Sequence, residues 1–133
     1  MRLEFTIPGP PQPKQRARKG KGGRWYTPTP TRRYHAHVAA CAHAALVKAK
    51  LIGKWPMDEE YMISIMIFFP DKRRRDADNV VKSIQDGCTH IIWHDDHRVG
   101  CYSPPWRIDR DNPRAEVVID VLDPESPLPH VIP

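Results

Sequence analysis

The segment 61–69, YMISIMIFF, limits the fold of this chain of 133 residues more than any other stretch. Its apolar residues fall at odd and even positions alike, and it is rich in Ile and Phe. Such a run is typical of a strand that is buried on both faces of a sheet. Pro70 follows directly and is expected to end the strand.

Two helices are predicted from apolar residues at three- and four-residue steps. The first covers about 31–51, with Thr31 as its expected N-cap and Gly53 as a suitable stop. The second covers about 78–91, and Asp78 is its expected N-cap because a carboxylate there accepts from free backbone N–H groups. We predict an α+β fold, with a small mixed β-sheet packed against these two main helices.

Further strands are expected at the two ends of the chain. Alternating apolar residues predict a strand over 2–7. A hairpin around the sequence DRDNP is expected to pair 99–108 with 115–122. A chain of this length is most simply one domain, which we assign to 1–122, followed by a flexible proline-rich tail over 123–133.

Positive charge is concentrated near the N-terminus. The formal net charge is +5, and residues 2–33 carry nine Lys and Arg against a single acid, Glu4. Residues 8–30 lack periodicity and predict a basic, mobile loop. Trp25 and Tyr26 lie among these cations and are suited to stacking on bases. The loop therefore favours contact with nucleic acid over an ordinary solvated surface.

Cysteine usage and hydropathy argue against a disulfide-rich secreted protein and against a membrane protein. The three cysteines share no close spacing, so a disulfide framework is not expected and reducing cytoplasm is the natural compartment. No run of 18 apolar residues is present, and the N-terminus lacks the apolar region of a secretion signal. We expect a soluble, cytoplasmic protein with no membrane partner.

Two pairs of carboxylates flank the second predicted helix. Asp76 and Asp78 lie one residue apart, directly after the basic run 72–75, and Asp95–Asp96 follow the helix. Like charges this close repel one another unless a positive charge holds them. Carboxylate ligands without a thiolate or imidazole suit Mg²⁺, with Mn²⁺ as a substitute, and such an ion stabilises charge on a phosphoryl transition state.

Most of these residues also have a structural interpretation. A role as the N-cap of the helix is enough to account for Asp78. Lys82 lies four residues later on the same helical face, so the two side chains could form an ordinary surface ion pair. Asp95–Asp96 fits a solvated turn. None of these interpretations explains Asp76.

A zinc site is a weaker alternative. His94 and His97 at i and i+3, with Cys88 nearby, do not match the four ligands of a closed structural site.

The segment RRRDADNVVKSIQDGCTHIIWHDDHRV resembles the central motif of the RusA-type Holliday junction resolvases, small endonucleases of phage origin. FTIPGPPQPKQRAR and TPTPTRRYHAHVAACA are similar to the opening strand, basic loop and first helix of that family. The likeness covers roughly residues 3–121.

This resemblance implies roles for individual residues. Metal binding is implied for Asp76, Asp78 and Asp96, and a place in the catalytic site for Lys82. Asn79, Asp86 and Asp95 match motif positions that we interpret as supporting. The resemblance also implies a homodimer, Mg²⁺ dependence, and paired nicks placed symmetrically across a four-way junction.

Two features depart from the family pattern. The span between Asp86 and the acidic pair is about one residue short, which leaves either Asp95 or Asp96 as the main ligand. GCYSPPWRID does not resemble the family's basic strand, and its Pro104–Pro105 is expected to break a central strand.

The leading hypothesis is a Mg²⁺-dependent endodeoxyribonuclease that resolves Holliday junctions or other branched DNA. Two alternatives remain open, namely a non-catalytic DNA-binding protein and a nuclease acting on flaps or forks. Under the leading hypothesis the DNA arms are clamped by seven basic residues: Lys14, Arg16, Arg18, Lys72, Arg73, Arg74 and Arg75.

Overall fold

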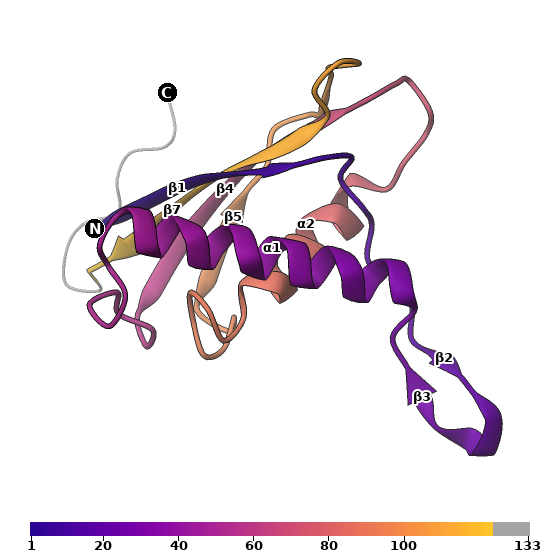
Figure 1. Ribbon diagram of the computed structural model, residues 1–133. Coiled ribbons are helices and arrows are strands. Elements are labelled where there is room, and N and C mark those ends of the chain that lie inside the picture. The colour runs from indigo at the N-terminus through magenta and orange to yellow at the C-terminus, as the bar shows by residue number, and fades with distance from the viewer. Residues whose placement is uncertain (124–133) are drawn as a thin grey trace.

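The computed structural model describes residues 1–123, and a single sheet covered on one face by two helices forms its body (Figure 1). The expected α+β architecture, with a mixed sheet and two main helices, is confirmed. The strands are β1 (Arg2–Pro8), β2 (Arg18–Lys19), β3 (Trp25–Tyr26), β4 (Glu60–Phe69), β5 (Val99–Tyr102), β6 (Arg107–Ile108) and β7 (Arg114–Leu122). The helices are α1 (Thr29–Lys48) and α2 (Ala77–Cys88), with a short 3₁₀ turn over Lys21–Gly23. The proline-rich tail beyond residue 123 lies outside the described residues.

Strand β4 lies inside the sheet and is paired along both edges. The order is β1-β7-β4-β5, and β6 extends the β5 edge along the end of β4. β7 runs antiparallel to β4 and to β1, whereas β5 and β6 run parallel to β4. The connection from β4 to β5 passes through α2, as a parallel pair requires.

The side chains of β4 alternate between buried and half-buried, which corrects the expectation of a strand buried on both faces. Tyr61, Ile63, Ile65, Ile67 and Phe69 are buried under the helices. The alternate residues, from Met62 to Phe68, are only partly covered on the open face of the sheet. The helices cover one face, so the apolar residues of the other face keep some contact with solvent (Figure 1).

The expected hairpin around DRDNP is wrong. β7 pairs with one edge of β4, and β5 and β6 pair with the other edge, so the two segments are separated by β4 itself. Local turn residues do not determine which edge a strand joins. Pro104–Pro105 does interrupt the strand as expected, because β5 ends at Tyr102 and β6 begins at Arg107.

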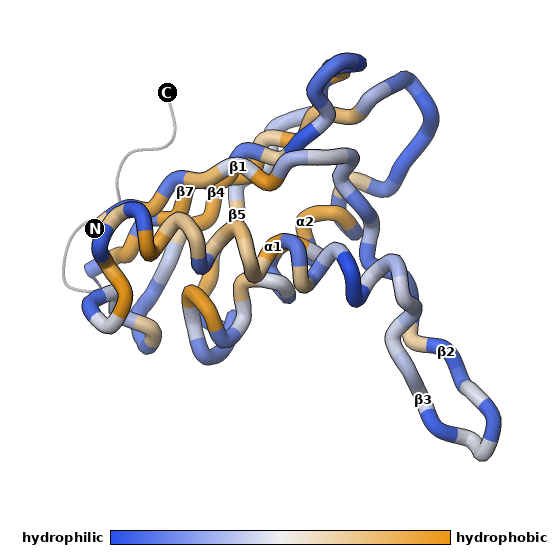
Figure 2. The backbone as a smooth tube through the Cα atoms, in the orientation of Figure 1, coloured by the Kyte–Doolittle hydropathy of each residue, from blue (hydrophilic) through white to orange (hydrophobic). Residues whose placement is uncertain are grey.

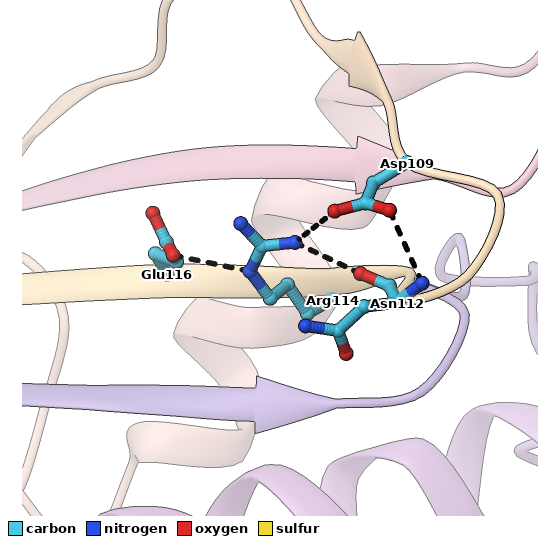
Figure 3. A network of polar contacts seen from close by, with 4 residues as sticks. All are labelled: Asp109, Asn112, Arg114 and Glu116. Carbon is cyan, nitrogen blue, oxygen red and sulfur yellow. Dashed lines mark hydrogen bonds and ion pairs between the residues drawn. The ribbon is translucent and has the colours of Figure 1, made fainter.

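The turn that leads into β7 is held by the side chain of Arg114 (Figure 3). Its guanidinium donates to Asp109 at 2.8 Å and to Glu116 at 3.1 Å, and it stacks over the ring of Phe68 at 3.9 Å. Arg114 also donates to the carbonyl of Asn112 at 2.9 Å. The Arg114 guanidinium lowers the pKa of the Asp109 carboxyl. This network fixes the crossing from one edge of β4 to the other.

Helix α1 begins two residues earlier than expected and ends at Lys48. Its N-cap is Pro28, which has no side-chain oxygen to offer, so Thr31 is not the cap. Thr31 is buried inside the first turn, and its hydroxyl accepts a hydrogen bond from the backbone N–H of Gln15 at 3.0 Å. Gly53 lies in the turns that follow the helix, with a left-handed φ of 75°.

Helix α2 begins at Ala77, and its N-cap is Asp76 rather than Asp78. The strongly amphipathic pattern predicted from the sequence is present: Val80, Ile84 and Cys88 are fully buried against the sheet and α1. Figure 2 shows hydrophilic residues along the loop between β4 and α2.

Strands β2 and β3 were not predicted. They form a two-stranded hairpin inside the basic segment 8–30, and this hairpin projects away from the body (Figure 1). The mobility of 8–30 stays a prediction. No helix in residues 1–123 is long and apolar enough to cross a membrane.

Gly87 allows α1 and α2 to approach closely, and we predict that Gly87→Ala destabilises the fold. An added Cβ would lie 2.6 Å from the Val38 Cβ and 3.1 Å from the His35 carbonyl oxygen. The gain in helix propensity is at most about 1 kcal/mol. Overpacking of this kind costs about 1–3 kcal/mol, so the free energy of unfolding measured in urea should fall.

The matched control is the same substitution made in a Val38→Gly background. Because the Cβ and the methyl groups of Val38 are absent there, Gly87→Ala should cost less than it does in the native protein. An equal cost in both backgrounds would contradict the contact.

Candidate functional site

Asp76 lies at the junction between the loop 70–76 and helix α2 and is exposed. Its carboxylate accepts hydrogen bonds from the backbone N–H of Asn79 at 3.2 Å and from the Asn79 side-chain amide at 3.0 Å. The first bond caps the helix, and the second orients the carboxylate. Capping therefore supplies the structural explanation for Asp76 that the sequence interpretation lacked. The remaining lone pairs of both oxygens face solvent.

Asp78 is the second residue of α2 and is exposed. Residues 74–78 line a surface hollow of about 510 Å³, so both aspartates border the same space as Arg74 and Arg75. The positive end of the helix dipole attracts negative charge to this position. The hollow is thus lined by two carboxylates and two guanidinium groups.

Lys82 is exposed one helical turn beyond Asp78. In the described part of the chain no ion pair joins the two side chains, so the simple surface pair is not formed. The Lys82 ammonium remains available to an external anion near the hollow.

The second acidic pair lies at the opposite end of the sheet. Val99 begins β5 opposite Tyr61 near the start of β4, and the Val99 N–H donates to the Asp96 carbonyl at 3.2 Å. Asp76 follows the other end of β4. From Tyr61 to Phe69, eight steps of about 3.3 Å give a separation of about 26 Å. Within residues 1–123 no three metal-ligating side chains gather, so Asp76, Asp78 and Asp96 do not meet in one chain.

Asp95 and Asp96 differ in their surroundings. The Asp95 carboxylate accepts from the backbone N–H of His97 at 3.0 Å and lies 3.3 Å from its ring nitrogen. The His97 backbone N–H and then its ring lower the pKa of Asp95. The Asp96 carboxylate makes no polar contact with the rest of the described chain, and it is exposed. Asp96 therefore has the freer carboxylate of the pair.

The zinc alternative is not supported at Cys88. This thiol is fully buried in the core, and burial raises its pKa to about 12. It is a packing residue, whereas His94 and His97 are exposed.

The basic run 72–75 divides into two kinds of residue. Arg75 is only 17% exposed: it pairs with Asp71 at 2.7 Å, donates to the carbonyl oxygens of Asp71 and Arg73, and stacks over the Phe69 ring at 4.7 Å. The Arg75 side chain lowers the pKa of Asp71. Lys72, Arg73 and Arg74 are exposed. Arg75 shapes the loop that carries Asp76, and its three neighbours present charge to solvent.

Lys14 and Asp86 connect the N-terminal segment to α2. The Lys14 ammonium lies 2.6 Å from the Asp86 carboxylate, and the Lys14 N–H donates to the Asn79 carbonyl at 2.9 Å. The His35 ring lies 3.9 Å from the same carboxylate, and burial lowers its pKa. The link was not predicted, because two residues 72 positions apart carry no shared local pattern.

Comparison with known proteins shows the family to which this chain belongs. The family model described as Endodeoxyribonuclease RusA matches residues 8–120. The chain belongs to the RusA family. This confirms the resemblance seen in the sequence, and the match includes both pairs of carboxylates. A search of curated proteins finds no match.

RusA membership implies Holliday junction resolvase nuclease activity and a part in DNA recombination. The RusA-like residues Asp76, Asp78, Asn79 and Lys82 all lie on the first turns of α2 in this chain. The later acidic pair, Asp95 and Asp96, is remote from them.

We predict that Arg75→Ala destabilises the protein, whereas Arg74→Ala leaves its stability within about 0.5 kcal/mol of the native value. Arg75 loses bonds to two carbonyls, a carboxylate and a ring, and its removal should cost about 1–3 kcal/mol. Urea unfolding of the two neighbouring variants measures the difference. Equal stabilities would show that Arg75 does not hold the loop.

Proposed function

We propose that this protein is a divalent-metal-dependent endodeoxyribonuclease that resolves four-way DNA junctions by paired nicks. The observation that carries the proposal is the hollow at the start of α2, where exposed Asp76 and Asp78 border exposed Arg74 in a chain of the RusA family. Carboxylates supply metal ligands, and the guanidinium attracts a phosphate.

The residues at the hollow fit Mg²⁺. Asp76 and Asp78 offer only oxygen donors, and the Asn79 amide at 3.0 Å holds one Asp76 oxygen in place while lone pairs stay free. Mn²⁺ suits the same donors. When bound, such an ion lowers the pKa of water and stabilises charge on a phosphoryl group. RusA resolvases depend in general on divalent metals.

Lys82 has a separate task in this proposal. Its ammonium, one turn from Asp78, neutralises the non-bridging oxygens of the scissile phosphate. Exposed Lys72, Arg73 and Arg74 bind the flanking backbone, together with Arg16 and Arg18 from the N-terminal segment. Lys14 and Arg75 contribute to the same surface mainly by holding its two loops, because both are already ion-paired.

The third aspartate comes from a second subunit in our proposal. Backbone bonds near the start of β4 hold the segment of Asp96, and Asp76 follows the other end of β4. A two-fold homodimer brings opposite ends of two sheets together, so that Asp96 of the partner subunit completes each site. Asp95 supports the turn through His97. Two such sites match the near two-fold symmetry of a four-way junction.

We expect Asp78→Asn to abolish cleavage and to leave junction binding intact. Asp78 does not cap the helix, so its change should not disturb the fold, unlike a change of Asp76. Loss of a metal ligand worth several kcal/mol lowers the rate roughly 100-fold or more. Cleavage of a synthetic four-way junction is measured with Mg²⁺, and binding is measured with a chelator.

The same assay separates the alternatives. A non-catalytic DNA-binding protein would leave every junction uncut with or without Mg²⁺, and a flap or fork nuclease would cut those structures faster than the junction. Retained cleavage by Asp78→Asn would remove the mechanism.

Mixed dimers test the shared site. Heterodimers purified with one Asp78→Asn subunit and one Asp96→Asn subunit contain one site without either change if the ligands come from both subunits. We expect these heterodimers to nick one strand, although each homodimer is inactive. If all three ligands came from one chain, both sites would be damaged and the heterodimer would be inactive too.

A further inference from the structure

The hairpin of β2 and β3 is a protrusion made of exposed residues. Every residue from Arg18 to Tyr26 is exposed except Gly20, which is partly covered. Its turn is closed by backbone bonds from Gly20 to Arg24 at 2.8 Å and from Gly23 to Gly20 at 3.2 Å. Figure 1 shows the hairpin extending beyond the N-terminal end of α1, away from the sheet. No buried side chain ties this hairpin to the core.

The two aromatic residues of the hairpin have different surroundings. The Tyr26 ring lies against Gly20, because a Cβ at Gly20 would stand 3.4 Å from two of its carbons. Tyr26 is 48% exposed, and Trp25 is 69% exposed. Within residues 1–123 the Trp25 ring makes no ring or cation contact. Tyr26 therefore supports the turn, and Trp25 leaves its indole free for a ligand.

The hairpin is positively charged, and no acidic side chain is paired with its cations in the described part of the chain. Residues 5–57 contain no Asp or Glu, and no ion pair of the described chain involves the cations of this hairpin. These cations are Arg18, Lys19, Lys21 and Arg24. In the antiparallel register Lys19 lies opposite Trp25, so a cation and the free indole share one face. An anionic ligand with flat rings fits this face.

We infer that Trp25 stacks on a DNA base at the branch point while Lys19, on the same face, binds an adjacent phosphate, and that the stacking selects junctions over duplex. The inference rests on the proposed function. Bases inside a duplex are stacked on both sides, whereas the strand exchange at a branch point interrupts stacking and exposes a base face. Aromatic stacking is tolerant of base identity, so the contact reads branching rather than sequence.

The test compares Trp25→Ala, Trp25→Phe and the native protein on a four-way junction and a duplex of the same length. Binding is measured with a chelator at one low salt concentration, so cleavage does not interfere. We expect Trp25→Ala to weaken junction binding by about tenfold and duplex binding by less than about twofold. Trp25→Phe should keep most of the affinity, since it retains a ring.

Two controls separate stacking from charge and from folding. Lys19→Ala should weaken junction and duplex alike and reduce the salt dependence of binding by about one counterion. Quenching of tryptophan fluorescence by the junction should be smaller in Trp25→Phe than in the native protein. The melting temperature should not change in Trp25→Ala, because its indole packs on nothing buried.

Unchanged junction affinity in Trp25→Ala, or an equal loss on junction and duplex, would overturn the inference. These outcomes differ from failure of the proposed function. If the native protein cuts junctions with Mg²⁺ while Trp25→Ala binds them normally, only the role of Trp25 fails. If the native protein never cuts but the junction-specific loss is seen, the nuclease proposal fails and the stacking contact stands.

Discussion

The pairing of β4 along both edges determines where the acidic residues of this protein lie. β5 runs parallel to β4, so the residues that precede β5 must lie at the start of β4. The residues that follow β4 lead into α2 from the other end. Asp96 belongs to the first group and Asp76 to the second. Their separation is thus a property of the parallel connection itself, and rearranging a surface loop does not remove it.

The cap of α2 and the proposed metal site depend on the same carboxylate. Asp76 accepts from the N–H and the side-chain amide of Asn79, which holds it beside Asp78. Arg75 fixes the preceding loop through Asp71 and Phe69. A helix end organised in this way presents its free oxygens in fixed positions, which a metal site needs. Structural and chemical interpretations of Asp76 are therefore compatible.

Elements with strong periodicity were predictable from sequence, and contacts between distant segments were not. The strands at 2–7 and 61–69 and the helix near 78–91 appear with small shifts at their ends. The prediction of a hairpin around DRDNP was wrong because the local sequence does not determine which edge of β4 a strand joins. Thr31 looked like a cap, but tertiary packing buried it beneath Gln15. The β2–β3 hairpin was missed because its strands contain two residues each, too few for a periodic signal.

For the candidate site, the amino-acid order determined which chemical groups are present: paired carboxylates beside clustered cations, in a chain of the RusA family. Residue types and local spacing are written directly in the chain, and so is the helical face shared by Asp78 and Lys82. Tertiary structure alone decided that Asp76 caps α2, that Lys14 pairs with Asp86, and that Asp96 lies across the sheet. These outcomes depend on strand direction and on contacts between segments far apart in the chain, and neither is encoded in any short stretch of residues.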